Sequence, residues 1–492
     1  MSDPIATPKS RFAQRTTPMI LAIAMFMEQM DSTVISTSLP AIAMDIDTSP
    51  IALKLALTSY LVSLAIFIPI SGWMADRFGA RKVFAAAIGV FIVGSVLCAT
   101  AGSLGAFVAS RFLQGMGGAM MTPIARLVLV RSTEKSDLVS AMAWLSVPAL
   151  VGPLVGPPVG GFITTYFSWH WIFLINVPIG LAGIWLANRF LPHMPPVATP
   201  KLDVPGLVLS GLAASGIVFG LSVVSLPALP PIVGIGAVVI GAICAMAYLV
   251  HARRAKNPLL ALDLLGNQVF RSSIIGGSIF RIGIGAVPFL LPLMLQLGFG
   301  FTAFQSGMIT FVTALGAIGM KLGTTWVFRS FGFRPVLIAG SLVAAASIAA
   351  MGLFTPATPI WLMMAIIFVG GFVRSMFFTG VNAFTYAEVS AEETSRATPI
   401  AAVAQQLSIA IGVAMAGGIL ELQAGMAGAS PTLGEFHIAF YVVAAVSALA
   451  ALAFLRLPPD AGSAVSGHIA VARSTTPINP PVADPKAAPP AP

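Results

Sequence analysis

The sequence predicts an all-helical membrane protein with fourteen transmembrane helices, arranged as two six-helix bundles related by a parallel repeat plus two inserted helices. Three observations support this prediction: an apolar composition, a row of long apolar runs and an internal repeat. Hydrophobic residues make up 57% of the 492 residues, charged residues make up 9%, and the mean hydropathy is +0.94. Soluble domains contain about 25% charged residues, so this composition argues against a soluble fold.

Apolar runs of about 20 residues recur along the chain, and each is long enough to cross about 30 Å of hydrocarbon as a helix. Glycines and prolines are frequent within these runs. Neighbouring helices inside a membrane bundle tolerate them, because they satisfy the freed backbone groups. The runs have approximate cores at 18–40, 53–73, 83–101, 106–130, 140–163, 171–190, 206–225, 231–251, 271–296, 304–326, 336–353, 360–384, 397–418 and 435–456.

The two halves of the chain repeat each other at an offset of 253 residues. Residues 73–83 and 326–336 share the positions of a tryptophan, a Phe-Gly pair, an arginine and a valine. At about 30 residues per helix and loop, this offset corresponds to about eight helices rather than six. Two helices inserted between two six-helix bundles fit this spacing. One charge differs between the copies, because Arg329 replaces Asp76.

The spacing predicts five segments in chain order. The last of them contains nine prolines and much alanine, which predicts a disordered tail. The expected boundaries are 1–17 for the N-terminal tail, 18–190 for the first bundle, 191–270 for a linker that contains the inserted helices 206–225 and 231–251, 271–457 for the second bundle, and 458–492 for the C-terminal tail.

Lysine and arginine gather in alternate loops, which predicts the orientation. The other set of loops contains Lys54 and almost nothing else. By the positive-inside rule, the basic loops and both termini lie in the cytoplasm. The net charge of +9 then reflects this bias and not a nucleic-acid patch. A cleaved signal peptide over residues 1–40 is the competing interpretation, but that run is long and polar at its far end, with no small-x-small cleavage site.

Residue types that build catalytic, metal or cofactor sites are scattered. Cys98 and Cys244 lie in separate apolar runs, and the five histidines lie in loops, at run ends or in the tail. They offer neither a disulfide framework nor a metal site. The chain has no Gly-x-Ser-x-Gly motif and no Walker loop, which argues against a hydrolase and against ATP as the energy source. We therefore expect no enzyme activity, no metal and no cofactor.

Five motifs, in order between residues 31 and 178, resemble those of the major facilitator superfamily of transporters, and the resemblance covers nearly the whole chain. Residues 31–40 and 168–178 resemble its fourteen-helix drug:proton antiporter branch, the EmrB/QacA-like group, and most of all the MdtD-type exporters. The loop motif contains Gly72, Asp76, Arg77, Gly79 and Arg81, the fourth-helix motif covers 111–118, and the fifth-helix motif associated with antiporters contains Gly152, Pro153, Gly156, Pro157, Gly160 and Gly161.

The resemblance implies alternating access in a bacterial cytoplasmic (inner) membrane, with proton entry driving the export of small amphiphilic compounds. A dedicated proton-coupled exporter of one anionic or zwitterionic metabolite is the alternative, and the sequence does not separate the two. A proton-coupled importer shares the fold, but the fifth-helix motif argues against it. The expected partners are the lipid bilayer, protons and a small-molecule substrate, with no nucleic acid. Nothing in the sequence indicates an accessory periplasmic or outer-membrane protein.

Glu28 and Asp31 are the two acidic residues expected inside the membrane, and their spacing places them on one face of the first helix. Intramembrane acids are costly and mark functional sites. The resemblance makes Asp31 the proton carrier, and the alternative is a salt bridge that only holds two helices together. Glu28 would titrate as a coupled partner of Asp31, or would stay protonated and inert.

Arg111 is the one basic residue expected inside the first bundle. The resemblance implies that it controls when Asp31 releases its proton, whereas a permanent ion pair is the alternative. Asp76, Arg77 and Arg81 are expected to form a cytoplasmic latch to a helix of the second bundle, and the alternative is a plain charged loop. In the fifth-helix motif, glycines four residues apart allow close helix packing and the prolines predict a bend.

The second half is expected to have no acid inside the membrane. Its interior basic residues are Arg281 and Arg374. Together with Gln114 and Gln405 they are the possible substrate contacts. The two arginines suit an anionic or zwitterionic substrate, whereas Glu28 and Asp31 suit a cationic one, and the sequence leaves both possibilities open. The inserted helices carry no charge inside the bilayer, and we assign them no transport chemistry.

Overall fold

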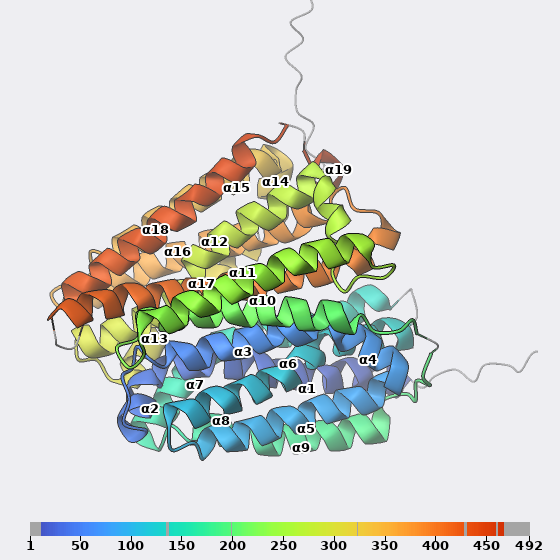
Figure 1. Ribbon diagram of the computed structural model, residues 1–492, viewed down its shortest axis with the longest axis horizontal. Coiled ribbons are helices and arrows are strands. Elements are labelled where there is room, and N and C mark those ends of the chain that lie inside the picture. The colour runs from blue at the N-terminus through green and yellow to red at the C-terminus, as the bar shows by residue number, and fades with distance from the viewer. Residues whose placement is uncertain are drawn as a thin grey trace, which may run out of the picture.

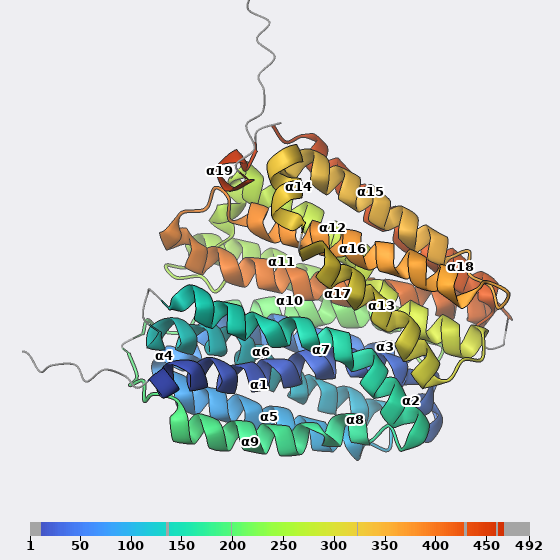
Figure 2. The same ribbon diagram turned by 180° about the vertical axis from the view of Figure 1, so that it is seen from behind.

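The computed structural model describes residues 11–133, 137–197, 199–321, 323–427, 431–458 and 461–466. Figures 1 and 2 show two groups of long helices lying side by side, one formed by the first half of the chain and one by the second. The helices α10 and α11 lie along one flank of the seam between the two groups, on the near side in Figure 1. The helix α10 packs on α3 of the first group and on α17 of the second, and α11 packs on α10.

Among the described residues, thirteen segments are long and apolar enough to cross a membrane. The helix α7, which packs along α1 and α13, is 29 residues long and adds a fourteenth. These helices coincide one for one with the predicted runs. They are α1 (Arg11–Val34), α3 (Lys54–Phe67), α5 (Ala80–Ala99), α6 (Leu104–Ser132), α7 (Leu138–Tyr166), α9 (Asn176–Phe190), α10 (Val204–Val223), α11 (Pro231–Arg254), α12 (Gln268–Leu293), α13 (Ala303–Lys321), α15 (Phe333–Met351), α16 (Ile360–Thr385), α17 (Ala391–Ala427) and α18 (Leu433–Leu455).

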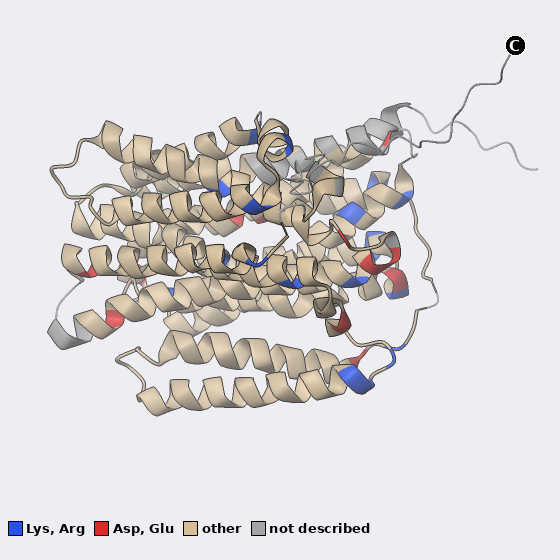
Figure 3. Cartoon of the chain, turned by 90° about the horizontal axis from the view of Figure 1, so that it is seen from above, with Lys and Arg blue, Asp and Glu red and all other residues tan. Residues whose placement is uncertain are grey.

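Short helices mark the two ends of the molecule. The start of α1, the helices α4 (Ser71–Phe78) and α14 (Thr324–Phe331), and the short α19 (Ser463–Ser466) lie at one end, called here the α4 end. The helices α2 (Leu39–Asp45) and α8 (Trp171–Leu174) lie at the other, called the α2 end. In Figure 3 most charged residues gather toward the α4 end.

The 253-residue repeat is also a repeat of structure. The helices α4 and α14 are both eight residues long and end at Gly79 and Gly332, which have φ of 90° and 75°. This left-handed backbone favours glycine, and it allows α5 and α15 to begin immediately in a new direction. Each short helix also carries the same edge-on aromatic pair, Trp73 with Phe78 and its counterpart 253 residues later, with ring centroids 6.0 and 6.1 Å apart.

The tails differ from the prediction where they are described. The helix α1 begins at Arg11, before the predicted start at residue 18. Within the C-terminal tail, Gly462 packs against Phe333 and Phe384, and α19 contacts α14, so residues 461–466 are ordered where disorder was predicted. Residues 1–10 and 467–492 lie outside the described residues.

A carboxylate fastens the inserted pair at the α4 end. Asp203 caps the N-terminus of α10 by accepting the N–H of Gly206 at 2.9 Å, and it also accepts the N–H of Leu259 at 3.0 Å. His251 of α11 lies 2.7 Å from the same carboxylate. Partial burial favours a higher pKa for Asp203, but these hydrogen bonds outweigh it and hold the pKa below its ordinary value.

The two groups of helices contact each other at the α2 end and spread apart toward the α4 end (Figure 1). At the α2 end the backbone N–H of Phe304 donates to the Thr165 hydroxyl at 3.0 Å, and the Gln296 amide donates to the Thr37 carbonyl at 3.1 Å. Glycines bring α7 and α13 together there. A Cβ on Gly161 would overlap the carbonyl oxygen of Ala303.

We expect Gly307→Val to separate α7 from α13, because a Cβ on Gly307 would overlap the carbonyl oxygen of Pro157. Overpacking of this kind costs about 1–3 kcal/mol. In a variant without native cysteines, the yield of a disulfide between Thr165→Cys and Phe304→Cys should fall. The matched control is Gly319→Val on the same helix, since a Cβ there meets nothing within 4 Å. Equal yields for both variants would contradict the close packing.

Candidate functional site

Asp31 lies at the centre of a buried polar network in the first group of helices. Its carboxylate accepts from the Arg111 guanidinium, the Gln114 amide and the Asn176 amide, each at 2.8 Å. Ser95 accepts from the same two amides, at 2.8 and 3.3 Å. All five side chains are at most 1% exposed. Four helices, α1, α5, α6 and α9, thus supply one fully enclosed carboxylate and the groups that satisfy it.

The Arg111 guanidinium is held on its other face by aromatic rings. Its central carbon lies 4.3 Å from the Tyr60 ring centroid and 5.8 Å from that of Phe173. Among the described residues, the Arg111 Nε atom and the Tyr60 hydroxyl have no hydrogen-bond partner. The guanidinium also donates to the Gln114 side-chain oxygen, and it is otherwise held by the charge of Asp31 and by cation–π contact. If the carboxylate took up a proton, much of the attraction that fixes Arg111 would disappear.

Glu28 lies one turn from Asp31 but in a different setting. Its carboxylate accepts from the Thr122 hydroxyl at 3.1 Å and from the Gln29 amide at 2.9 Å, and it lines a cavity that Asp31 does not reach. One turn beyond Thr122 on α6 lies an exposed second basic residue, Arg126. Arg111 is therefore not the only basic residue within the predicted spans of the first bundle, because 106–130 includes Arg126 as well.

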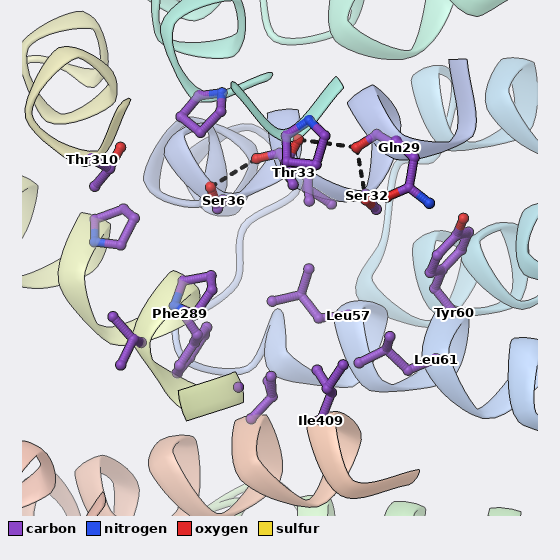
Figure 4. A pocket seen from close by; sticks show the side chains of 18 of the residues that line it. Gln29, Ser32, Thr33, Ser36, Leu57, Tyr60, Leu61, Phe289, Thr310 and Ile409 are labelled. Carbon is purple, nitrogen blue, oxygen red and sulfur yellow. Dashed lines mark hydrogen bonds between the residues drawn. The ribbon is translucent and has the colours of Figure 1, made fainter. Parts of the chain in front are cut away.

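The cavity has a volume of about 370 Å³ and lies between the two groups of helices. Helices α1, α3, α6 and α7 line it on one side, and α12, α13, α16 and α17 line it on the other. Figure 4 shows Gln29, Ser32, Thr33 and Ser36 along one wall, with Leu57 and Leu61 and then Phe289 and Ile409 lying across from them. The lining is mostly apolar, with a small number of polar groups, as is usual for small-molecule sites.

Two of the four predicted substrate contacts line this cavity and two do not. Arg374 and Gln405 belong to its lining. Gln114 lies outside it, because its amide is used entirely within the Asp31 network. Arg281 also lies outside it: its guanidinium donates to Asn382 at 3.1 Å and lies over the Phe378 ring at 5.2 Å. Both are therefore structural in this conformation.

A second buried ion pair was missed by sequence reasoning. Lys54, predicted to lie in a loop, is the first residue of α3 and is fully buried, and its ammonium contacts the carboxylate of Glu421 on α17. Glu421 is only 6% exposed, which corrects the expectation that the second half has no buried acid in its spans. Ser225, in the turn after α10, joins the pair at 2.6 Å from the carboxylate and 3.2 Å from the ammonium.

Comparison with known proteins decides the family. The family model for the Major Facilitator Superfamily matches residues 21–330 and 273–487. The chain belongs to the major facilitator superfamily. Two relatives, from Pectobacterium atrosepticum and Cronobacter sakazakii, are each named "Putative multidrug resistance protein MdtD" and are each 35% identical to it. The matches cover 90% and 92% of this chain, and 95% and 96% of the relatives.

Solved structures of the superfamily share the fold. A POT family transporter in complex with a thioalcohol-conjugated peptide superimposes with a TM-score of 0.67 at 16% identity, covering 89% of this chain and 95% of that one. A D-xylose–proton symporter gives a TM-score of 0.66, also at 16% identity, covering 91% of this chain and 99% of that one. At this identity the likeness concerns the fold alone. The protein is thus a multi-pass membrane protein of a transporter superfamily.

The superfamily loop motif lies at the α4 end, around α4 and Gly79. Asp76 forms an ion pair with Arg131 at the end of α6, at 2.8 Å, and its backbone carbonyl accepts the N–H of Val197. The Arg81 guanidinium donates to the carbonyl of Leu191 at 3.3 Å. These contacts of the predicted latch lie within the first bundle and the linker. They are made where the two groups of helices stand apart. The remaining motif residues, Gly72 and Arg77, lie on α4 itself.

The fifth-helix motif places α7 between the two groups. A Cβ on Gly152 would lie 2.7 Å from Cβ of Gln29, and a Cβ on Gly156 or Gly160 would overlap α1 further along. Gly161 packs in the same way on α13. The motif prolines Pro153 and Pro157 line the cavity. The helix α7 therefore contacts the helix that bears Asp31 on one side and the second half of the chain on the other.

Proposed function

We propose that this protein is a proton-coupled antiporter that exports small amphiphilic compounds by alternating access. One observation carries the proposal: a buried carboxylate, Asp31, is paired with Arg111, and that arginine also lines a cavity formed by both halves of the chain. A change of charge at Asp31 can therefore change the position of Arg111 in the cavity wall. The relatives named as multidrug resistance proteins support a broad substrate range.

The α4 end is proposed to face the cytoplasm, in a bacterial inner membrane with both termini cytoplasmic. Basic residues of described loops and helix ends gather there, for example Arg77, Arg131, Arg254 and Arg334, whereas Lys54 at the α2 end is buried and paired. The structure then represents an inward-facing state, closed at the periplasmic α2 end. The cavity binds and releases its occupant unchanged, so no enzymatic step is proposed.

The proposed cycle follows from the two states of Asp31. In the inward-facing state the carboxylate is ionised and holds Arg111 in the wall of the cavity. When the α2 end opens, a proton from outside neutralises Asp31, and the released guanidinium moves toward the cavity and helps to displace the substrate. One proton moving down about 100 mV and one pH unit supplies roughly 2.3 plus 1.4 kcal/mol, enough for a several-hundredfold gradient.

Two sets of contacts are proposed to alternate as the halves rock. The Lys54–Glu421 pair and the α7–α13 glycine contacts hold the α2 end closed in the inward-facing state. In the outward-facing state Asp76, Arg77 and Arg81 would instead engage the second bundle and close the α4 end. The pairing of Asp76 with Arg131 occupies that carboxylate while the α4 end is open.

The test of this function is substrate-driven proton release. Adding a transported compound to everted vesicles with an acidified lumen should collapse the pH gradient in proportion to the compound taken up. A response to many unrelated amphiphiles supports multidrug export, whereas a response to one compound alone would identify a dedicated metabolite exporter. Transport that proceeds without any proton movement would contradict antiport.

A further inference from the structure

The charges that face the cavity are fewer than the sequence implies. Of the acidic and basic residues in its lining, Arg111 is committed to Asp31, which leaves Glu28 on α1 and Arg374 on α16. Asp31 is buried behind the wall and already paired, so it does not present a free negative charge to a substrate. The cavity therefore has one acidic wall and one basic wall, supplied by opposite halves of the chain.

Arg374 has no partner among the residues that the structure describes. Its guanidinium makes no hydrogen bond, ion pair or aromatic contact with any described residue, in contrast to Arg281 on the neighbouring α12. Holding an unpaired guanidinium within a membrane span is costly, and such residues mark ligand or ion pathways. Gln405 and Gln406 of α17 line the same cavity, and their side-chain amides also make no hydrogen bond to the described residues. The wall formed by α16 and α17 therefore presents hydrogen-bond donors that have no acceptor among the described residues.

Glu28 is in the opposite situation. Two donors already satisfy its carboxylate, the Thr122 hydroxyl at 3.1 Å and the Gln29 amide at 2.9 Å. It can still attract a positive group, but the protein does not depend on a substrate to satisfy it. Of the two charged groups, it is thus Arg374 that lacks a partner of opposite charge, and an anion would supply one. The apolar side chains of Leu57, Leu61, Phe289 and Ile409 line the same cavity (Figure 4).

We propose that Arg374 is the specificity-determining residue of the cavity, and that the substrates are amphiphiles that carry a carboxylate or similar compact anion on an apolar body. The planar guanidinium fork matches a carboxylate with two parallel hydrogen bonds, and Gln405 and Gln406 add further donors. A positive group at the far end of the molecule adds affinity through Glu28. This inference rests on the proposed transport function and names the substrate class of that site.

The inference predicts an order of affinity within one series of compounds. Four congeners share one aromatic body and carry a carboxylate with an amine, a carboxylate alone, the methyl ester of that carboxylate, or an amine alone. Their equilibrium binding to the purified full-length protein in lipid nanodiscs is measured by calorimetry. The zwitterion should bind most tightly, the carboxylate next, and the ester about tenfold or more weaker than the carboxylate, since a charge-assisted pair is lost.

Variants of Arg374 test whether this side chain causes the preference for the carboxylate over its ester. Arg374→Gln should make the carboxylate and its ester bind equally, and Arg374→Lys should keep part of the difference because it keeps the charge. The matched control is Arg281→Gln, which removes the other interior arginine of the second half, outside the cavity, and should leave the order unchanged. Tightest binding of the amine-only congener, or an order unaffected in both Arg374 variants, would overturn the inference.

The binding experiment can fail or succeed independently of the proton-flux experiment that tests antiport. Binding is measured without a membrane potential or a pH gradient, so it does not depend on coupling through Asp31. A carboxylate preference with no substrate-driven proton flux would contradict antiport and leave the site assignment standing. Proton flux driven equally well by esters and carboxylates would support antiport and overturn the role of Arg374.

Discussion

Replacing Asp31 with asparagine is expected to abolish export against a gradient while leaving exchange down a gradient. Asparagine has nearly the same shape but cannot take up and release a proton, so it fixes the network in the uncharged state that frees Arg111. The several-hundredfold gradient available from one proton should collapse to about one. Efflux of a fluorescent amphiphile from energised cells, and its counterflow in proteoliposomes, measure the two activities separately.

The control for Asp31→Asn is Asp45→Asn. Asp45 lies at the end of α2, is exposed, and accepts from the Trp169 indole at 3.1 Å, away from the cavity. This variant should export as the wild type does. Because Asp31→Asn leaves a buried guanidinium without its anion, thermal stability is measured alongside, and exchange activity shows that the variant is folded. Export at the wild-type level by Asp31→Asn would show that the ion pair is only structural.

Breaking the Lys54–Glu421 pair is expected to open the α2 end. Removing one partner of a buried ion pair costs about 3–5 kcal/mol, because the other charge is left unpaired. Opening of the α2 end would hydrate that charge, so most of this cost falls on the closed state. A shift of this size changes the ratio of the two states more than a hundredfold. Lys54→Met and Glu421→Gln should each favour the outward-facing state.

The double variant Lys54→Met/Glu421→Met distinguishes the effect of an unpaired buried charge from a general disruption of packing by the substitutions. With both charges removed, the apolar pair can repack, and closure should largely return. Disulfide yield between Thr165→Cys and Phe304→Cys, the positions joined across the seam at 3.0 Å, reports closure. The single variants should cross-link poorly and the double variant well. Wild-type yields in both single variants would rule out the pair as a closing contact.

The sequence identified the helices and the two members of the Asp31–Arg111 pair because strong local signals mark them. Long apolar runs located all fourteen helices, and the repeat located α4 and α14 with their glycines. The resemblance of residues 31–40 and 111–118 to superfamily motifs pointed to Asp31 and Arg111, which the structure shows as an ion pair. In each case the signal lies within one helix or in an exact repeat of residues.

The lining of the cavity and the second ion pair depend on how the helices are rotated and where they end. The periodicity of apolar residues does not determine either. Arg281 and Arg374 look alike in sequence, yet packing turns only Arg374 into the cavity. Glu421 was placed beyond the end of its run, and Lys54, at the start of the run 53–73, was assigned to a loop, although they meet in the interior. Asn176 lies in a recognised motif, but its bond to Asp31 requires α9 to lie beside α1.

The most direct test of the central claim is proton flux in everted vesicles, comparing the wild type with Asp31→Asn across cationic, neutral, anionic and zwitterionic amphiphiles. We predict that several compounds collapse an imposed pH gradient through the wild type and that none does so through Asp31→Asn. A gradient that no compound disturbs in the wild type, or one that both proteins discharge equally, would contradict proton coupling through Asp31.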